Sequence, residues 1–230
     1  MKTIGLLGGM SWESTAYYYK VINELVYKKL GGYHSAKIIM YSVNFDEFRT
    51  LQLKDDWDAI AVKLIKLSKR LQKTADVLLL CTNTMHNIAS ELQSNIKIPL
   101  IHIADPTAEA IKEKKISTIG LLGTKITMEQ DFYKKRLTDE HGISVIVPDE
   151  SQRQIIDDII FNELVLGQIK TESRDKFIQI CKDLIEAGAE GIILGCTEIP
   201  LLIQQNDVSV PVFDTTYLHA KAGVEFILNS

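Results

Sequence analysis

Short apolar runs alternate along the whole chain with longer segments whose apolar positions recur every three or four residues. Runs rich in Val, Ile and Leu are typical of strands that are buried on both faces, and the longer segments are typical of amphipathic helices. This alternation predicts parallel sheets covered by helices. We expect strands at residues 3–7, 37–43, 77–80, 100–102, 118–122, 144–147, 191–194 and 211–213.

The segments between these strands are expected to be helices, most of them amphipathic. In the segment 56–72, Ile60, Leu64 and Leu67 fall on one helical face. Asp105 followed by Pro106 has the pattern of a helix start, because Asp caps a helix and Pro suits its first turn. The other expected helices span residues 14–29, 85–94, 106–113, 128–141, 152–166, 172–187 and 217–228.

The chain also contains an internal repeat. The hexapeptide Thr-Ile-Gly-Leu-Leu-Gly occurs at 3–8 and again at 118–123, a shift of 115 that is half of the 230 residues. A second echo relates 75–82 to 189–196, and it matches Cys196 either with Cys81 at a shift of 115 or with Thr82 at a shift of 114. Sequence symmetry alone does not choose between these two, because loop lengths vary freely.

Two related halves imply two similar α/β domains with a cleft between them. We place the N-terminal half at 1–115 and the C-terminal half at 116–230. The last helix, at about 215–230, is expected either to stay with its half or to pack back on the N-terminal one.

Four strand ends carry residues that suit a small anionic ligand. In α/β sheets, ligands bind beyond the carboxyl ends of the strands, where helix N-termini present free N–H groups. The four segments combine small residues with hydroxyls or thiols, as a carboxylate pocket needs. They are Gly8-Gly9-Met10-Ser11, Cys81-Thr82-Asn83-Thr84, Gly123-Thr124 and Gly195-Cys196-Thr197-Glu198.

The three cysteines have different expected roles. Cys196 follows a buried strand and precedes a helix, so we expect the local dipole to lower its pKa and to enrich the thiolate. Glu198 is placed to orient that thiol or to share its proton. Cys181 lies within an apolar helical segment and is expected in the core, and Cys81 is left open by the repeat.

Charge and motif content favour small-molecule chemistry. The net charge is −4 and the basic residues are spread along the chain, so we expect neither nucleic acid nor an anionic membrane as a partner. No apolar run has the length of a membrane span or signal segment, which predicts a cytoplasmic location. The glycines lack dinucleotide-binding spacing, and the histidines lack metal-ligand spacing. His86 is as well suited to a structural hydrogen bond as to proton transfer.

Three motifs of the chain resemble those of the aspartate/glutamate racemase family. They are Lys2-Thr3-Ile4-Gly5-Leu6-Leu7-Gly8-Gly9-Met10-Ser11, Cys81-Thr82-Asn83-Thr84-Met85-His86 and Gly195-Cys196-Thr197-Glu198. The resemblance runs from end to end. It implies two pseudo-symmetric parallel-sheet α/β domains with the active site in the cleft between them, no cofactor, an amino acid as the small-molecule substrate, and a homodimer.

The resemblance also implies which residues act. The family pattern has a cysteine directly before Asn-Thr-x-His, and that position is Thr82 here, which implies the shift of 114. The chain is similar to a bacterial subgroup in which threonine replaces the first cysteine and Cys196 remains. We therefore expect a cofactor-independent amino-acid racemase, an isomerase, in which the Cys196 thiolate removes the α-proton and Thr82, or a water it holds, supplies one on the opposite face.

Substrate contacts follow from the same resemblance and from the strand ends. Arg49 falls near an arginine that binds substrate carboxylate in some aspartate racemases, and those relatives have a lysine at a position that aligns with Val165. An exposed loop position without a role is the alternative for Arg49. The expected substrate-binding residues are Met10, Ser11, Arg49, Gln52, Asn83, Thr84, Thr124, Thr197 and Glu198.

Two other functions remain open. A malonate-type decarboxylase of the same fold family uses a single cysteine to protonate an enolate, and a catalytically silent protein would only bind an amino acid. A cysteine hydrolase fits less well, because the sequence places no histidine beside Cys196.

Overall fold

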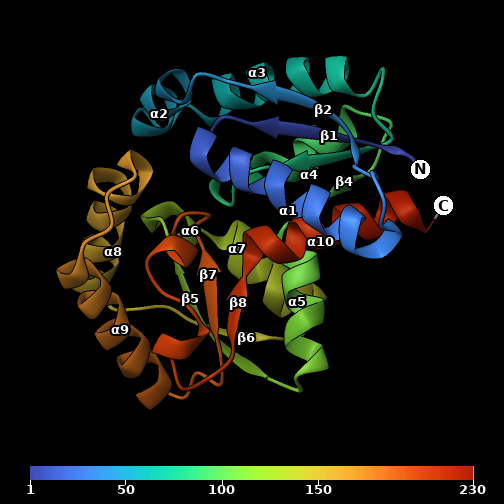
Figure 1. The fold of residues 1–230 in the computed structure, drawn as a ribbon. Coiled ribbons are helices and arrows are strands. Elements are labelled where there is room, and N and C mark those ends of the chain that lie inside the picture. Colours follow the sequence, from blue (N-terminus) through green and yellow to red (C-terminus); the bar gives the residue numbers. More distant parts are fainter. Residues whose placement is uncertain (230) are drawn as a thin grey trace. The chain divides into compact units, whose positions relative to one another are not determined.

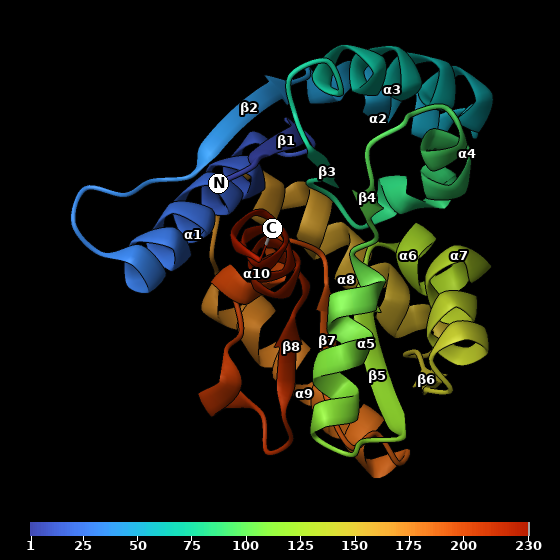
Figure 2. The same ribbon diagram turned by 90° about the vertical axis from the view of Figure 1, so that its right-hand side faces the viewer.

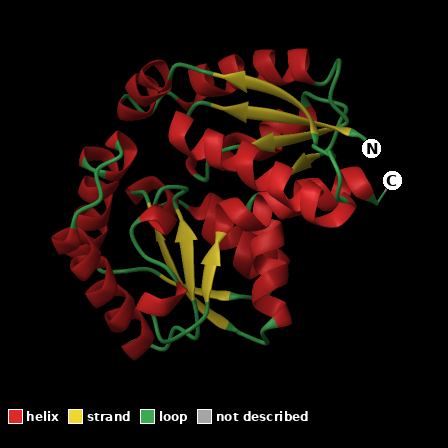
Figure 3. Ribbon diagram, viewed as in Figure 1, coloured by secondary structure: helices red, strands yellow, loops and turns green. Residues whose placement is uncertain are grey.

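The protein consists of two compact units, each built on its own parallel sheet. The structure is a computed structural model that describes residues 1–229. The first unit comprises Met1–Ile103 together with the C-terminal segment from His219 onward, and the second comprises Ala104–Leu218. Each sheet has four strands, and Figure 3 shows helices beside both sheets. The predicted fold class, two parallel-sheet α/β domains, is confirmed.

The sheet of the first unit has the strand order β2-β1-β3-β4 (Figure 1). All pairs are parallel, and Leu7 of β1 lies between Tyr41 and Leu80. β3 is completely buried, whereas β2 at the sheet edge is largely exposed. The strands are β1 (Thr3–Gly8), β2 (Lys37–Ser42), β3 (Val77–Leu80) and β4 (Leu100–Ile101).

Helices cover both faces of this sheet, and each face has its own apolar core. Ile60 and Leu64 are fully buried on the face that includes Leu7 and Leu80, and Leu67 is partly buried there, as predicted. The opposite core includes Tyr18 and residues of the last helix. The helices are α1 (Trp12–Leu30), α2 (Phe45–Leu53), α3 (Trp57–Leu71), the 3-10 helix Thr84–Ile88, α4 (Ala89–Ser94) and the part of α10 (Thr215–Leu228) from His219 onward.

The second unit repeats the same strand arrangement in the order β6-β5-β7-β8. Its core includes Phe177 and Cys181, so the prediction that Cys181 is a core residue is confirmed. The strands are β5 (Thr118–Gly123), β6 (Ser144–Ile146), β7 (Ile192–Gly195) and β8 (Val212–Asp214). The helices are α5 (Ala104–Glu113), α6 (Lys125–Glu129), α7 (Asp131–Lys135), the π-helical turn Arg136–Glu140, α8 (Glu150–Asn162), the 3-10 helix Leu164–Leu166, α9 (Thr171–Glu186) and the 3-10 helices Ile199–Leu201 and Gln205–Asp207.

Four expected helices differ from the structure, and two of these, at 85–94 and 152–166, are each divided into an α-helix and a 3-10 helix. The segment 128–141 is not one helix, because Gln130 has extended backbone angles and separates α6 from α7. The helix expected at 106–113 begins at Ala104, so Asp105 is not its cap. Asp105 lies in the first turn and its carboxylate binds Arg136 instead.

The strand registers resolve the ambiguity of the internal repeat. Leu7 pairs with Leu80 in the first sheet, and Leu122 pairs with Leu194 in the second. The equivalent residues Leu7 and Leu122 are 115 positions apart in the sequence, whereas the equivalent residues Leu80 and Leu194 are 194 − 80 = 114 positions apart. One residue fewer therefore separates the two paired strands in the second unit, and Thr82 is the structural counterpart of Cys196.

No helix in the described part of the chain combines the length and the apolar character that crossing a bilayer requires.

Candidate functional site

The loop after β1 is a tight turn shaped by Thr15. The Thr15 Oγ1 accepts a hydrogen bond from the Gly9 N–H at 2.8 Å and donates to the Ser11 carbonyl at 2.8 Å. Gly9 has a φ of +93°, and an added Cβ would lie 2.4 Å from the Val43 carbonyl oxygen, so only glycine fits. Met10 and Ser11 are buried in this turn, and Ser11 caps α1.

The segment after β3 holds Thr82, Asn83 and Thr84, all buried. The Thr82 carbonyl lies 2.7 Å from His86 Nδ1, and His86 Nε2 lies 3.2 Å from the Ile103 nitrogen. A carbonyl can only accept, so Nδ1 carries the proton and Nε2 accepts from the Ile103 N–H. Both ring nitrogens of His86 bind backbone, which favours the structural role. The Thr82 hydroxyl has no hydrogen-bond partner among the described residues, and it is available to a ligand.

Cys81, next to Thr82, is not available for chemistry. Its side chain is fully buried in the core that includes Tyr18, and its Sγ lies 3.7 Å from the Leu79 carbonyl oxygen. Burial raises the pKa of this thiol far above its ordinary value. Successive residues after a strand point to opposite sides, so Cys81 fills the core and leaves the position before Asn83 to Thr82.

Helix α2, which the sequence pattern does not reveal, carries Arg49 and Gln52. The alternative that Arg49 lies on an exposed loop is wrong, because its side chain is partly buried on a helix. Gln52 is buried, and its Nε2 is 4.0 Å from Met85 Sδ, while its Oε1 has no partner in the structure as described. A buried acceptor without a donor is costly, which suggests that a ligand N–H group completes it.

In the second unit, Cys196 follows β7 and is hydrogen bonded to Glu198. The Cys196 Sγ donates to Glu198 Oε2 at 3.1 Å, and the Thr197 hydroxyl donates to the same oxygen at 2.7 Å. All three residues are buried. Cys196 is therefore a thiol whose proton already points at a carboxylate.

The expectation that a helix dipole lowers the pKa of Cys196 is wrong. Burial, and then the negative charge of Glu198, raise the pKa of Cys196 well above its ordinary value. The segment after Glu198 is a single 3-10 turn, Ile199–Leu201, which is too short to supply the aligned peptide dipoles of a helix. The thiolate thus depends on transfer of the proton to an acceptor.

Thr124 lies near Cys196 in the second unit, because the strands that precede the two residues are paired. Gly123 pairs with Gly195, and an added Cβ on Gly195 would lie 2.7 Å from the Leu122 carbonyl oxygen. The two glycines therefore allow the ends of β5 and β7 to approach closely. Thr124 caps α6 and shares a hydrogen bond with the Thr127 hydroxyl at 3.0 Å.

Val165 lies on the 3-10 helix Leu164–Leu166 of the second unit. It is partly buried and packs against the apolar core of that unit. The position aligned with a lysine of some relatives thus serves packing here.

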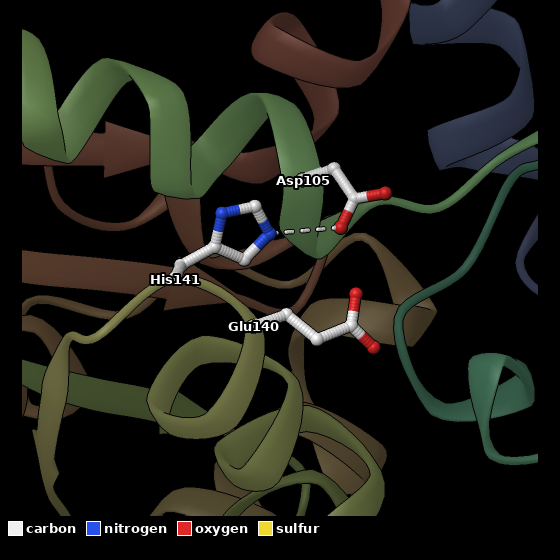
Figure 4. Close-up of side chains that lie close together, drawn as sticks. All are labelled: Asp105, Glu140 and His141. Carbon is white, nitrogen blue, oxygen red and sulfur yellow. Dashed lines mark hydrogen bonds and ion pairs between the residues drawn. The ribbon is translucent and has the colours of Figure 1, made fainter.

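A cluster of Asp105, Glu140 and His141 has the residue types of a metal site (Figure 4). Arg136 already pairs with both carboxylates of the cluster, with Asp105 through Nε at 2.6 Å and Nη2 at 2.9 Å and with Glu140 through Nη1 at 3.2 Å. His141 Nε2 lies 3.1 Å from Asp105. Because the guanidinium pairs with both carboxylates, we interpret this cluster as an ion-pair network that ties the start of α5 to the π-helical turn.

Asp105 makes the stability of this network depend on pH. Burial raises the pKa of its carboxyl, but the hydrogen bonds and charges of Arg136 and His141 outweigh burial, and the net pKa is lowered. A lowered folded-state pKa stabilises the fold above the unfolded value, near 3.9, and this contribution is lost as the pH falls through the folded-state value. We expect Asp105→Asn to lower the free energy of unfolding by about 1 kcal/mol at pH 7. Urea unfolding of both proteins should show this difference shrinking below about pH 4, and a constant difference would contradict it.

Comparison with known proteins identifies the class of protein. Residues 7–223 match the Asp/Glu/Hydantoin racemase family. The chain belongs to this family and is an isomerase of the amino-acid racemase class. The sequence-based assignment to the racemases is confirmed.

Three similar proteins span nearly the whole chain. A Yersinia pestis protein assigned to the Asp/Glu racemases is 52% identical, with a TM-score of 0.93 and coverage of 99% of this chain and 100% of that one. An aspartate racemase homologue from Pyrococcus horikoshii is 38% identical, with a TM-score of 0.85 and coverage of 98% and 99%. The broad specificity amino-acid racemase RacX of Bacillus subtilis is 25% identical over 98% of both chains.

Proposed function

We propose that this chain is a cofactor-independent racemase of the aspartate/glutamate type that moves the α-proton with Cys196 and Thr82 on opposite faces of the substrate. The observation that carries the proposal is the structural equivalence of these two residues. Each follows the matching strand in the sheet of its own unit. The α-carbon of a bound substrate would then have a thiol on one face and a hydroxyl on the other.

Glu198 supplies the acceptor that this scheme needs. The Cys196 proton passes to the carboxylate that it already faces at 3.1 Å, and the resulting thiolate takes the α-proton of the substrate. Thr82, or a water that it holds, supplies a proton to the other face. Glu198 then releases its proton to solvent, and solvent returns a proton to Thr82. The threonine hydroxyl is a poor acid near neutral pH, so the two directions of the reaction are unequal.

Hydrogen-bond donors at the strand ends stabilise the carbanion. In this scheme, N–H and O–H groups of Ser11, Asn83, Thr84 and Thr124, together with the backbone N–H of Thr197, bind the α-carboxylate and stabilise the charge that develops there. The unpaired Gln52 Oε1 accepts from the substrate ammonium.

The substrate side chain lies toward Met10 and Arg49. Arg49 supplies a positive charge for an acidic side chain. Valine rather than lysine at position 165 agrees with a range of substrates wider than aspartate and glutamate, and the relative RacX is itself named a broad specificity amino-acid racemase.

The test is α-deuterium incorporation in heavy water, followed by proton NMR for a panel of L- and D-amino acids. We expect wash-in for acidic amino acids, at different rates from the two enantiomers. Equal rates would contradict the asymmetric scheme. Carbon dioxide release from substituted malonates would indicate a decarboxylase instead, and tight binding without exchange would indicate a catalytically silent binding protein.

Glu198→Gln should separate thiol reactivity from turnover. The negative charge of Glu198 raises the pKa of Cys196, so its removal lowers that pKa and speeds alkylation by iodoacetamide at pH 7, about tenfold per pKa unit. Racemisation should fall about 100-fold, because the proton acceptor is lost. Glu186→Gln, at an exposed position of α9, is the matched control. Slower alkylation of the Glu198 variant would contradict the assigned role.

We also propose that the protein is a homodimer, as its resemblance to the family implies.

A further inference from the structure

A chain of buried hydrogen bonds in the first unit begins between α1 and α10. The Tyr18 hydroxyl lies 2.8 Å from His219 Nδ1, and His219 Nε2 lies 2.9 Å from the Ile101 carbonyl oxygen. A carbonyl only accepts, so Nε2 carries the proton of the neutral ring and Nδ1 accepts from the Tyr18 hydroxyl. Both side chains are fully buried. Figure 2 shows α1 beside the part of α10 from His219 onward, and the two helices share an apolar core. The pair therefore connects both helices to strand β4.

The chain continues from β4 to the segment after β3. The Ile103 N–H donates to His86 Nε2 at 3.2 Å, and His86 Nδ1–H donates to the Thr82 carbonyl at 2.7 Å. The backbone of residues 101–103 thus joins the two histidines. The Thr82 backbone is held, through two buried rings, by helices that are distant from it in the sequence.

Strand β4 is the weakest element of this chain. It has two residues, lies at the edge of the sheet order and pairs with β3 through Leu100 and Ile101. A segment with few ladder bonds is easily displaced. The bond from His219 to the Ile101 carbonyl supplies a fixed point for β4, and a displacement of β4 would reach the Thr82 carbonyl through His86.

The second unit holds the counterpart of Thr82 in a different way. The position 114 residues after His86 is Pro200, which has no N–H group to donate. The Cys196 carbonyl accepts instead from the Ile199 N–H at 3.2 Å. Support by two rings is therefore a feature of the Thr82 side. This difference fits the chemistry, because a threonine hydroxyl is a weak acid and its proton transfer depends strongly on close placement.

We infer that Tyr18 and His219 are positioning residues for proton transfer at Thr82, an inference that rests on the proposed function. They act through the backbone of β4 and through His86. Their loss would let the Thr82 hydroxyl shift relative to the α-carbon, while the groups proposed to bind the substrate stay in place. A displacement of 1 Å in a reacting group costs about 100-fold in rate, so a smaller shift should cost about tenfold or less.

The test separates inversion from exchange on the Cys196 face. We expect Tyr18→Phe, which removes only the hydroxyl, to lower the kcat for inversion about threefold, and His219→Leu, which removes both ring bonds, to lower it about tenfold. The KM and the rate of deuterium exchange with retention should stay within about twofold, because the lost placement matters only in the transition state of the second face. A general loss of folded protein would lower both rates together. Tyr19→Phe, at a 53% exposed position of α1, is the matched control and should be native.

A double-mutant cycle tests whether these residues act as one chain. In His86→Asn, the amide can still donate to the Thr82 carbonyl, but the acceptor for the Ile103 N–H is lost. Adding Tyr18→Phe to this variant should have no further effect, and additive losses would contradict the chain. His219→Gln keeps an amide N–H for the β4 carbonyl and should recover part of the inversion rate that His219→Leu loses.

Hydrogen exchange of the Ile103 amide, measured by NMR, reports the chain without turnover. Exchange should be faster in Tyr18→Phe and His219→Leu than in the native protein and unchanged in Tyr19→Phe. A native protein without racemisation would refute the proposed function and this role with it. An active native protein whose inversion rate survives in both Tyr18→Phe and His219→Leu would overturn the inference alone, as would equal losses of inversion and of exchange with retention.

Discussion

Cys196→Ala is expected to abolish α-proton exchange from both enantiomers, with turnover reduced about 10³- to 10⁴-fold. The thiol faces a carboxylate at 3.1 Å and is the group from which the thiolate forms. Without sulfur, Glu198 remains as an acceptor, but the proposed base at the α-carbon is missing. Deuterium wash-in, measured by NMR separately from the L- and D-forms of the best substrate, reports both directions of exchange.

The matched control for this change is Cys181→Ala. Cys181 is buried in the core of the same unit, so both variants lose a thiol, and only one loses it at the strand end. We expect Cys181→Ala to retain exchange at near-native rates. If exchange continued in Cys196→Ala and stopped in Cys181→Ala, the catalytic thiol would be Cys181 rather than the thiol after β7. The proposed mechanism would then be wrong.

Much of the fold follows from the apolar pattern, because buried parallel strands give continuous runs that sequence reasoning detects. All eight expected strands are present, and each boundary lies within one residue of the expected one. The helix α2 escapes detection for a physical reason. It has nine residues, of which only Phe48 and Gln52 are buried, so its apolar periodicity is too short to recognise.

The electrostatics of the site could not be read from the sequence in the same way. The expectation for Cys196 assumed a helix after β7, but the segment is one 3-10 turn, and burial and Glu198 decide the pKa instead. The contrast between Cys81 and Thr82 likewise depends on register, because a one-residue difference decides which side chain faces the core. Local helical geometry and strand register are set by tertiary contacts, which a single sequence does not display.

Loss of the hydroxyl in Thr82→Val is expected to reduce racemisation about 100-fold, because the group proposed to protonate the second face is removed while the side-chain shape is kept. The effect on α-hydrogen exchange should differ between the two enantiomers. In the proposed scheme Cys196 still removes and returns a proton on its own face, so one enantiomer should exchange its α-hydrogen for deuterium without inverting. Chiral chromatography measures inversion and mass spectrometry measures exchange on the same samples.

Two further substitutions at position 82 test whether the hydroxyl is the group that matters. Thr82→Ser keeps a hydroxyl and should retain most of the inversion rate. Thr82→Cys places a thiol at the structural counterpart of Cys196 and should bring the wash-in rates of the two enantiomers closer together, because thiols of similar pKa exchange the roles of acid and base. Native inversion rates in Thr82→Val would show that the second proton comes from elsewhere, and the pairing of residues 82 and 196 would then have no catalytic meaning.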